Sequence, residues 1–116
     1  METTLSTMFV AYVSVSQSFR PSMTIAELEA AAASAWGLSL AKGRRVERLI
    51  AVLDGHPIAA WECRDAYPTD YLYSVAGGER PRIAFDVGAP LPVLPAYHDV
   101  PGLRRGIATA EIEVGE

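Results

Sequence analysis

Three aromatic side chains, Trp36, Trp61 and Tyr67, have the clearest capacity in this sequence to hold a ligand. Flat aromatic rings stack against a nucleotide base, and each such contact contributes about 1–3 kcal/mol. The same rings are equally suited to pack a helix against a sheet as part of a core. The residues therefore leave two interpretations open, an aromatic pocket or a core that uses both Trp rings.

Two further side chains extend the candidate site. Tyr71 alternates with Tyr73 along a tyrosine-rich segment, and tyrosine offers rigid contact area at low entropic cost, although the same residues also pack long loops onto a core. Arg82, with Arg80 close by, is expected to reach the mouth of the pocket. The candidate ligand-binding residues are Trp36, Trp61, Tyr67, Tyr71 and Arg82.

One short stretch of the chain holds a cluster of basic residues, Lys42, Arg44, Arg45 and Arg48. Such a cluster can contact phosphate or an acidic partner. The alternative is a solvated helix face, since Glu47 interrupts the run. The chain carries a formal net charge of −4, so any contact with nucleic acid is confined to this local basic patch.

Catalytic motifs are absent from the sequence. A single cysteine, Cys63, excludes an internal disulfide and a cysteine zinc cage. His56 and His98 lack a third ligand at metal spacing, and the chain has no phosphate-binding loop or G-x-S-x-G motif. We expect no cofactor, no metal and no catalytic residue, with a small enzyme that uses Tyr, His and Asp side chains as a minor alternative.

The length of 116 residues fits one domain, and half of the residues are hydrophobic. No apolar run approaches the roughly 20 residues that span a bilayer. The first ten residues also lack the basic region of a signal peptide. The expected location is the cytoplasm, without a membrane partner.

The first half of the chain predicts one strand and two helices. Residues 8–16 (MFVAYVSVS) are apolar on both faces, which is typical of a central or covered strand. A capping box, Thr24 with Glu27, begins a helix that Gly37 is expected to end. Ser39 is expected to cap a shorter helix over residues 40–48, which Gly43 weakens by about 1 kcal/mol relative to alanine.

The second half predicts short strands. Asp54-Gly55 is typical of a type I′ turn joining strands 49–53 and 59–64. A tyrosine-rich loop is expected over 65–78, and a proline-rich extended connection over 88–102, with strands at 82–87 and 107–114. The predicted class is α+β: a small curved mixed or antiparallel sheet, or a partial barrel, with two helices near the N-terminus.

The segment from residue 19 to residue 68 also resembles a known pattern. It reads F-R-P-S-M-T-x-x-E-L, then W-G-L-S, a basic stretch, L-I-A-V-L-D-G-H-P-I-x-A-W and A-Y-P; Arg82, Phe85 and Gly88 follow at the places of a short R-W-x-F-x-G strand. This pattern is similar to a small bacterial and phage domain of the PUA-like superfamily, which includes EVE and ASCH relatives. Ser34-Ala35 stand where the pattern has Arg-Gly, and Tyr67 and Ile83 where it has Trp.

The resemblance covers roughly two thirds of the chain and implies one PUA/EVE-like domain over residues 1–116. It also implies a non-enzymatic module whose aromatic pocket recognises a base, a nucleotide or a modified nucleic acid. The alternative is a phage or mobile-element protein–protein interaction module that inhibits or modulates host machinery through the tyrosine-rich loop and the proline-rich stretch. A homodimer through an unpaired edge strand is compatible with both functions.

Overall fold

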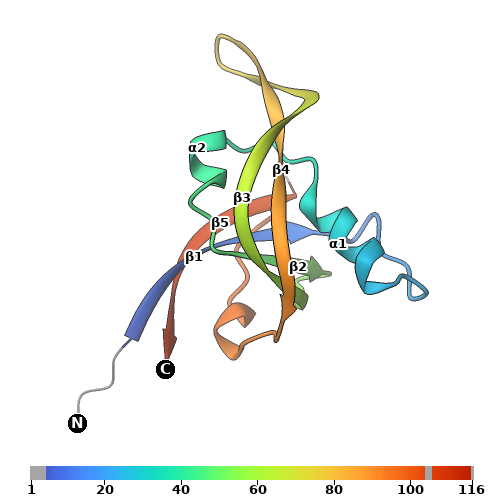
Figure 1. Ribbon diagram of the computed structural model, residues 1–116, viewed down its shortest axis with the longest axis vertical. Helices are drawn as coiled ribbons and strands as arrows, with labels where there is room; N and C mark the ends of the chain where they lie inside the picture. The colour runs from blue at the N-terminus through green and yellow to red at the C-terminus, as the bar shows by residue number, and fades with distance from the viewer. Residues whose placement is uncertain (1–4, 104–105, 116) are drawn as a thin grey trace.

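A computed structural model describes residues 5–103 and 106–115, and its five strands form one mixed sheet (Figure 1). The strands are β1 Leu5–Ser14, β2 Arg48–Leu53, β3 His56–Val75, β4 Gly78–Leu91 and β5 Ile107–Gly115. Two helices, α1 Ile25–Ala33 and α2 Leu40–Gly43, lie between β1 and β2, and a 3-10 helix, η1 Pro95–His98, lies between β4 and β5.

The strand order is β4-β3-β2-β1-β5. Strands β1 and β2 are parallel, because the chain crosses over through α1 and α2, and the other neighbouring pairs are antiparallel. The sheet is open. This agrees with the predicted small mixed sheet and is consistent with a partial barrel.

Both faces of the sheet are covered, which explains the apolar runs in its central strands. Along β1, Ala11 and Val13 face the layer that contains α1, whereas Val10 and Tyr12 face the layer that contains η1. Strand β2 alternates in the same way, with Leu49 on the first face and Ile50 and Val52 on the second. The prediction of a central, covered first strand is confirmed.

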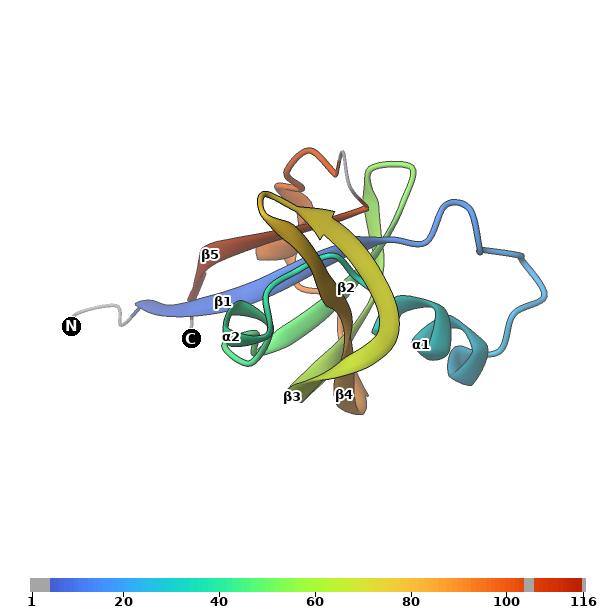
Figure 2. The ribbon, with the colours of Figure 1, turned by 90° about the horizontal axis from the view of Figure 1, so that it is seen from above.

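Strands β3 and β4 form a long hairpin whose turn projects beyond the rest of the sheet (Figure 1). Seen from above, β3 curves along its length (Figure 2), and its pairing with β4 shifts register at three places. The predicted loop over 65–78 is therefore wrong, since β3 continues to Val75. Pro68 lies at one of the irregularities, where a missing donor is tolerated.

Helix α1 begins at the predicted capping box but ends before the predicted stop at Gly37. The Thr24 hydroxyl accepts a hydrogen bond from the Glu27 amide at 3.1 Å, and the Glu27 carboxylate accepts one from the Thr24 amide at 3.3 Å, so the capping box is confirmed. The helix ends at Ala33, with Ser34 as an extended C-cap. Gly37 does not end it and lies instead against the ring of Tyr73.

Helix α2 is much shorter than predicted. Ser39 caps it as expected, accepting a hydrogen bond from the Lys42 amide at 3.3 Å. It ends at Gly43 because the chain joins the sheet soon afterwards: Val46 is buried, and the amide of Glu47 donates to the carbonyl of Phe9 on β1 at 2.7 Å. The predicted continuation to Arg48 is wrong.

The turn between β2 and β3 matches the prediction, whereas the prediction of an extended connection without regular structure over 88–102 is wrong in part. Asp54 and Gly55 both have positive φ, 50° and 82°, as the predicted type I′ turn requires. The proline-rich segment is extended at first, since β4 runs to Leu91, and then forms η1, whose Tyr97 is buried against the sheet. None of the helices in the described ranges is long and apolar enough to cross a membrane.

Candidate functional site

The segment between α1 and α2 is fixed to the edge of the sheet at Trp36. Its backbone amide and carbonyl each form a 2.9 Å hydrogen bond with the backbone of Ile83 on β4. The indole Nε1 donates to the carbonyl of Ala32 at 2.7 Å, so the half-buried ring is held against the end of α1. These contacts give the ring one defined orientation.

The ring of Trp36 forms one wall of an open cavity of about 510 Å³, here named the Trp36 cavity. Its lining consists of Ser14, Ser16, Gln17, Ser18, Trp36, Leu103 and Gly106. At Gly106 a Cβ atom would come within 3.0 Å of the indole, and φ there is +81°, so glycine allows the two segments to approach closely.

Hydroxyl and amide groups dominate the rest of this cavity. They come from the end of β1 and the turn that follows it. The Ser16 hydroxyl accepts a hydrogen bond from the Asp54 amide at 3.2 Å and lies 3.4 Å from the Ser14 hydroxyl. The cavity therefore combines a fixed aromatic face with neutral hydrogen-bonding groups, which suits a planar ligand with polar edges.

A second hollow, here named the Tyr73 groove, lies between the α1–α2 link and the projecting part of the β3–β4 hairpin. It has two parts that meet at Tyr73. The apolar part, about 290 Å³, is lined by Leu38, Ser39, Leu40, Pro68, Tyr73, Arg80, Pro81 and Ile83. The polar part, about 330 Å³, is lined by Gly37, Tyr73, Ser74 and Arg82.

Tyr73 is held between the two walls of this groove. A Cβ atom at Gly37 would come within 3.2 Å of its ring, and the Arg82 guanidinium carbon lies 5.9 Å from the ring centroid. The sequence assigned Arg82 to an aromatic pocket with both Trp residues. The structure places it here, with Tyr73.

The three aromatic residues expected to form one pocket are not brought together. Trp61 is 0% exposed and belongs to the core on the α1 face of the sheet, so it lines neither cavity, and its Nε1 has no hydrogen-bond partner within the described residues. Tyr67 and Tyr71 are 51% and 70% exposed on β3. The core alternative therefore holds for Trp61, whereas Trp36 does line a cavity.

The basic patch is likewise distributed over several environments. Arg44 forms an ion pair with Asp65 at 3.4 Å, and the guanidinium of Arg45 lies 4.6 Å from the ring centroid of Phe9. Arg48 begins β2 and hydrogen-bonds Tyr97 on the η1 face. Lys42 remains on exposed α2. The four residues therefore differ in their contacts, and Lys42, Arg44 and Arg45 are exposed.

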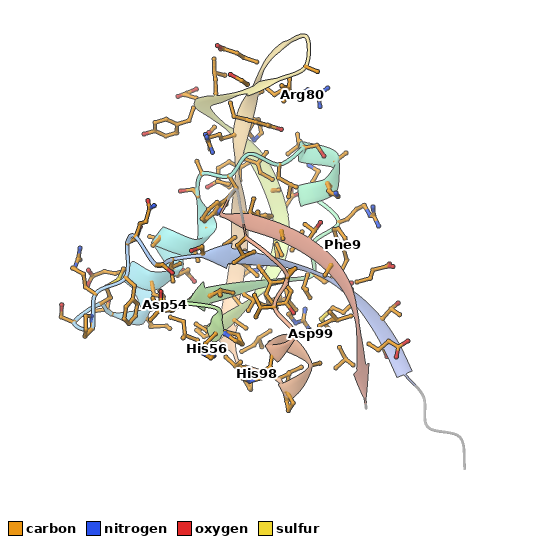
Figure 3. The ribbon with its side chains drawn as sticks, turned by 180° about the vertical axis from the view of Figure 1, so that it is seen from behind. Phe9, Asp54, His56, Arg80, His98 and Asp99 are labelled. Atoms are coloured by element: carbon orange, nitrogen blue, oxygen red, sulfur yellow. The ribbon has the colours of Figure 1, made fainter. Side chains whose placement is uncertain are left out.

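Cys63, His56, His98 and Asp99, the side chains with the widest chemical capacity, lie outside the linings of both the Trp36 cavity and the Tyr73 groove. Cys63 is buried, and burial raises the pKa of its thiol to about 11. His56, His98 and Asp99 lie at the end of the molecule opposite Arg80 and the hairpin tip (Figure 3). Across residues 5–103 and 106–115, no group of three His, Cys, Asp or Glu side chains could hold a metal ion.

Sequence reasoning missed most of the residues that line the two hollows. A usable signal was the polar run that interrupts the apolar first strand, with Ser14, Ser16 and Ser18 at alternate positions. Tyr73 was considered only as part of a loop surface. In the structure β3 continues through Tyr73, and its ring lies beside Gly37 and Arg82 in the groove.

Comparisons of the chain with models of protein families, with curated proteins and with solved structures find no match.

Proposed function

We propose that this protein is a non-enzymatic, PUA/EVE-like binding module that takes a nucleobase, free or within a nucleotide or modified nucleic acid, in the Trp36 cavity. The observation that carries the proposal is the pairing of one fixed indole face with a run of hydroxyl and amide groups in the same open cavity. Stacking supplies affinity, and hydrogen bonds to the edge of the base supply selectivity.

The size and chemistry of the Trp36 cavity support a small planar ligand. Its volume of about 510 Å³ falls within the roughly 300–1,000 Å³ of known ligand pockets. Leu103 adds an apolar contact, and the serine and glutamine side chains offer both donors and acceptors. The described lining residues carry no charge, so the base itself, rather than phosphate, is the feature recognised.

The architecture is compatible with this proposal. An open, curved, mixed sheet carries the α1–α2 crossover between its parallel strands, and the cavity lies where that crossover meets the end of β1. The proposal of binding rather than turnover is supported by the described lining residues, among which no nucleophile lies together with a base.

The test is a thermal-shift panel of nucleosides, nucleotides and their base-modified forms. A ligand at a hundredfold excess over its Kd stabilises the folded state by about 2.7 kcal/mol, which raises Tm by roughly 10 °C in a domain of this size. The responding ligand is expected to be recovered chemically unchanged. No shift with any member of the panel would refute the proposal.

Two surface variants assign the binding to the cavity. Gln17→Ala removes one exposed polar group from the lining and is expected to weaken binding about tenfold while leaving Tm of the free protein nearly unchanged. Ser22→Ala, at an exposed position outside the cavity, is the matched control and should bind like the unmodified protein. Equal losses in both variants would place the ligand elsewhere.

A further inference from the structure

We propose that the Tyr73 groove is a second binding site, independent of the Trp36 cavity, that takes an acidic peptide segment anchored by one large apolar side chain. The two hollows have no lining residue in common, and consecutive residues contribute to them: Trp36 lines the cavity and Gly37 lines the groove. The two sites are therefore adjacent in the chain and chemically unlike each other.

The apolar part of the groove is suited to a hydrocarbon side chain. Leucine, isoleucine and proline side chains and the ring of Tyr73 form nearly all of its surface, and its volume of about 290 Å³ is small. A nucleobase placed there would leave the polar groups on its edges without partners, which is costly. An apolar side chain has no hydrogen bonds to lose on entry, and its surface is removed from water.

Two guanidinium groups stand beside this apolar part. Arg80 lines it directly, and Arg82 lines the adjoining polar part with the hydroxyl of Ser74. Within residues 5–103 and 106–115 the ion pairs are Arg20–Glu27 and Arg44–Asp65, so neither groove arginine is paired with a carboxylate of the described chain. Guanidinium groups bind carboxylates in short, directional, charge-assisted hydrogen bonds.

The third feature of the proposed peptide site is the edge of the sheet. Strand β4 is an edge strand, and in the described part of the chain the backbone bridge on its outer side is Trp36 with Ile83. A peptide bound in the groove would lie beside this edge, and because Pro81 has no N–H to offer there, its side chains rather than its backbone would carry the recognition. Tyr71 and Leu72, on neighbouring β3, are large hydrophobic residues that are 70% and 54% exposed.

These features together favour a peptide over a nucleic acid. A polynucleotide would use the arginines but leave the apolar part of the groove unused, because its sugars and phosphates are polar and its bases carry polar edges. A peptide with carboxylates on either side of an aromatic or aliphatic residue uses both parts at once. The complementarity of charge and of apolar surface identifies the occupant as an acidic, apolar-anchored segment of a partner protein.

The experiment titrates three fluorescein-labelled pentapeptides into the intact protein and follows fluorescence anisotropy. The first is fluoresceinyl-Glu-Asp-Phe-Asp-Glu-amide, with the label on the N-terminal amine; the second replaces its four acidic residues with Gln and Asn, and the third replaces Phe with Ser. The first peptide is expected to bind at least tenfold more tightly than either of the others. Equal binding of all three, or no binding of the first, would overturn the proposal.

Variants locate the peptide. Arg80→Gln combined with Arg82→Gln is expected to lower affinity for the acidic peptide roughly tenfold or more, because two charge-assisted contacts are lost. Arg20→Gln removes one positive charge from an exposed residue that does not line the groove and should leave the affinity unchanged. Unfolding curves of every variant are the check that a loss of affinity does not come from a loss of folding.

Competition separates this site from the proposed function. A nucleoside that binds the Trp36 cavity should not displace the peptide, and the arginine variants should bind the nucleoside normally. A single-stranded oligonucleotide of ten thymidines is the probe for the other class of partner. Displacement of the peptide by this oligonucleotide at lower concentration than by unlabelled peptide would assign the groove to nucleic acid and contradict the proposal.

Discussion

The backbones of Trp36 and Ile83 exchange two hydrogen bonds of 2.9 Å, and this bridge fixes the loop after α1 to edge strand β4. The bridge sets the orientation of the Trp36 ring toward Gly106 and at the same time places Gly37 against Tyr73. Both candidate sites thus depend on the same backbone bridge, which joins two segments that lie far apart in the sequence.

Trp61 is expected to behave as a core residue. Its ring is fully buried between strands and helices, so Trp61→Ala should lower the free energy of unfolding by about 3–5 kcal/mol. Trp61→Phe should cost less, since it also removes an Nε1 group that lacks a partner in the described structure. Urea denaturation measures both, and a loss below 1 kcal/mol for the alanine variant would contradict this placement.

Gly43 is expected to be required by packing, although helix propensity argues the opposite. A Cβ atom at this buried position would collide with the side chain of Ile83 and approach Ala66 within 3.2 Å. Gly43→Ala should therefore destabilise the protein by about 1–3 kcal/mol, whereas propensity alone predicts a gain of about 1 kcal/mol. Thermal unfolding of Gly43→Ala decides between the two expectations: a lower Tm supports the packing requirement, and a higher Tm contradicts it.

The capping box of α1 should make stability depend on pH. Hydrogen bonds from the Thr24 backbone and side chain, with a smaller contribution from Arg20, lower the pKa of Glu27 below its ordinary 4.5. Because the folded pKa is the lower one, this stabilisation is present above pH 4.5 and is lost as the pH falls through the folded value. Thr24→Ala should cost about 1 kcal/mol near neutral pH.

Unfolding curves from pH 7 to pH 3 provide the check. The difference in stability between the unmodified protein and Thr24→Ala should shrink as the solution becomes acidic. Ser22→Ala, just before the capping box, serves as the control and should show a constant difference. A gap between Thr24→Ala and the unmodified protein that does not change with pH would contradict the account.

Cys63 is expected to be unreactive in the folded protein. Its thiol is buried and its pKa is raised to about 11, mainly by desolvation, so roughly one thiol in a thousand is ionised at pH 8. A disulfide reagent such as dithiobis(nitrobenzoic acid) should label the native protein far more slowly than the urea-unfolded chain. Complete labelling of the native protein within seconds would show that the thiol is accessible and activated.

Local signals in the sequence were sufficient for several elements. The Thr24–Glu27 pair begins α1, Asp54-Gly55 forms the predicted turn, and the doubly apolar pattern of 8–16 marks β1 as central. Each of these depends on side chains and backbone groups only a few residues apart. Such features are readable without knowledge of the fold.

Features set by distant contacts could not be predicted in this way. Residues 65–75 carry the polar and proline signals of a loop, yet they form a strand because β4 pairs with them beyond the body of the sheet. Helix α2 ends early because Glu47 pairs with Phe9, 38 residues away. The roles of Trp36 and Trp61 differ for the same reason, since burial is decided by which strands surround each ring.

The most direct test of the central claim is a nuclear magnetic resonance titration of the two indole N–H signals. During titration with the nucleoside selected by thermal shift, the Trp36 signal and the amides of Gln17 and Gly106 should move together and saturate, while the Trp61 signal stays in place. Saturable movement confined to other residues, with the Trp36 signal unchanged, would contradict the assignment of the Trp36 cavity as a base-binding site.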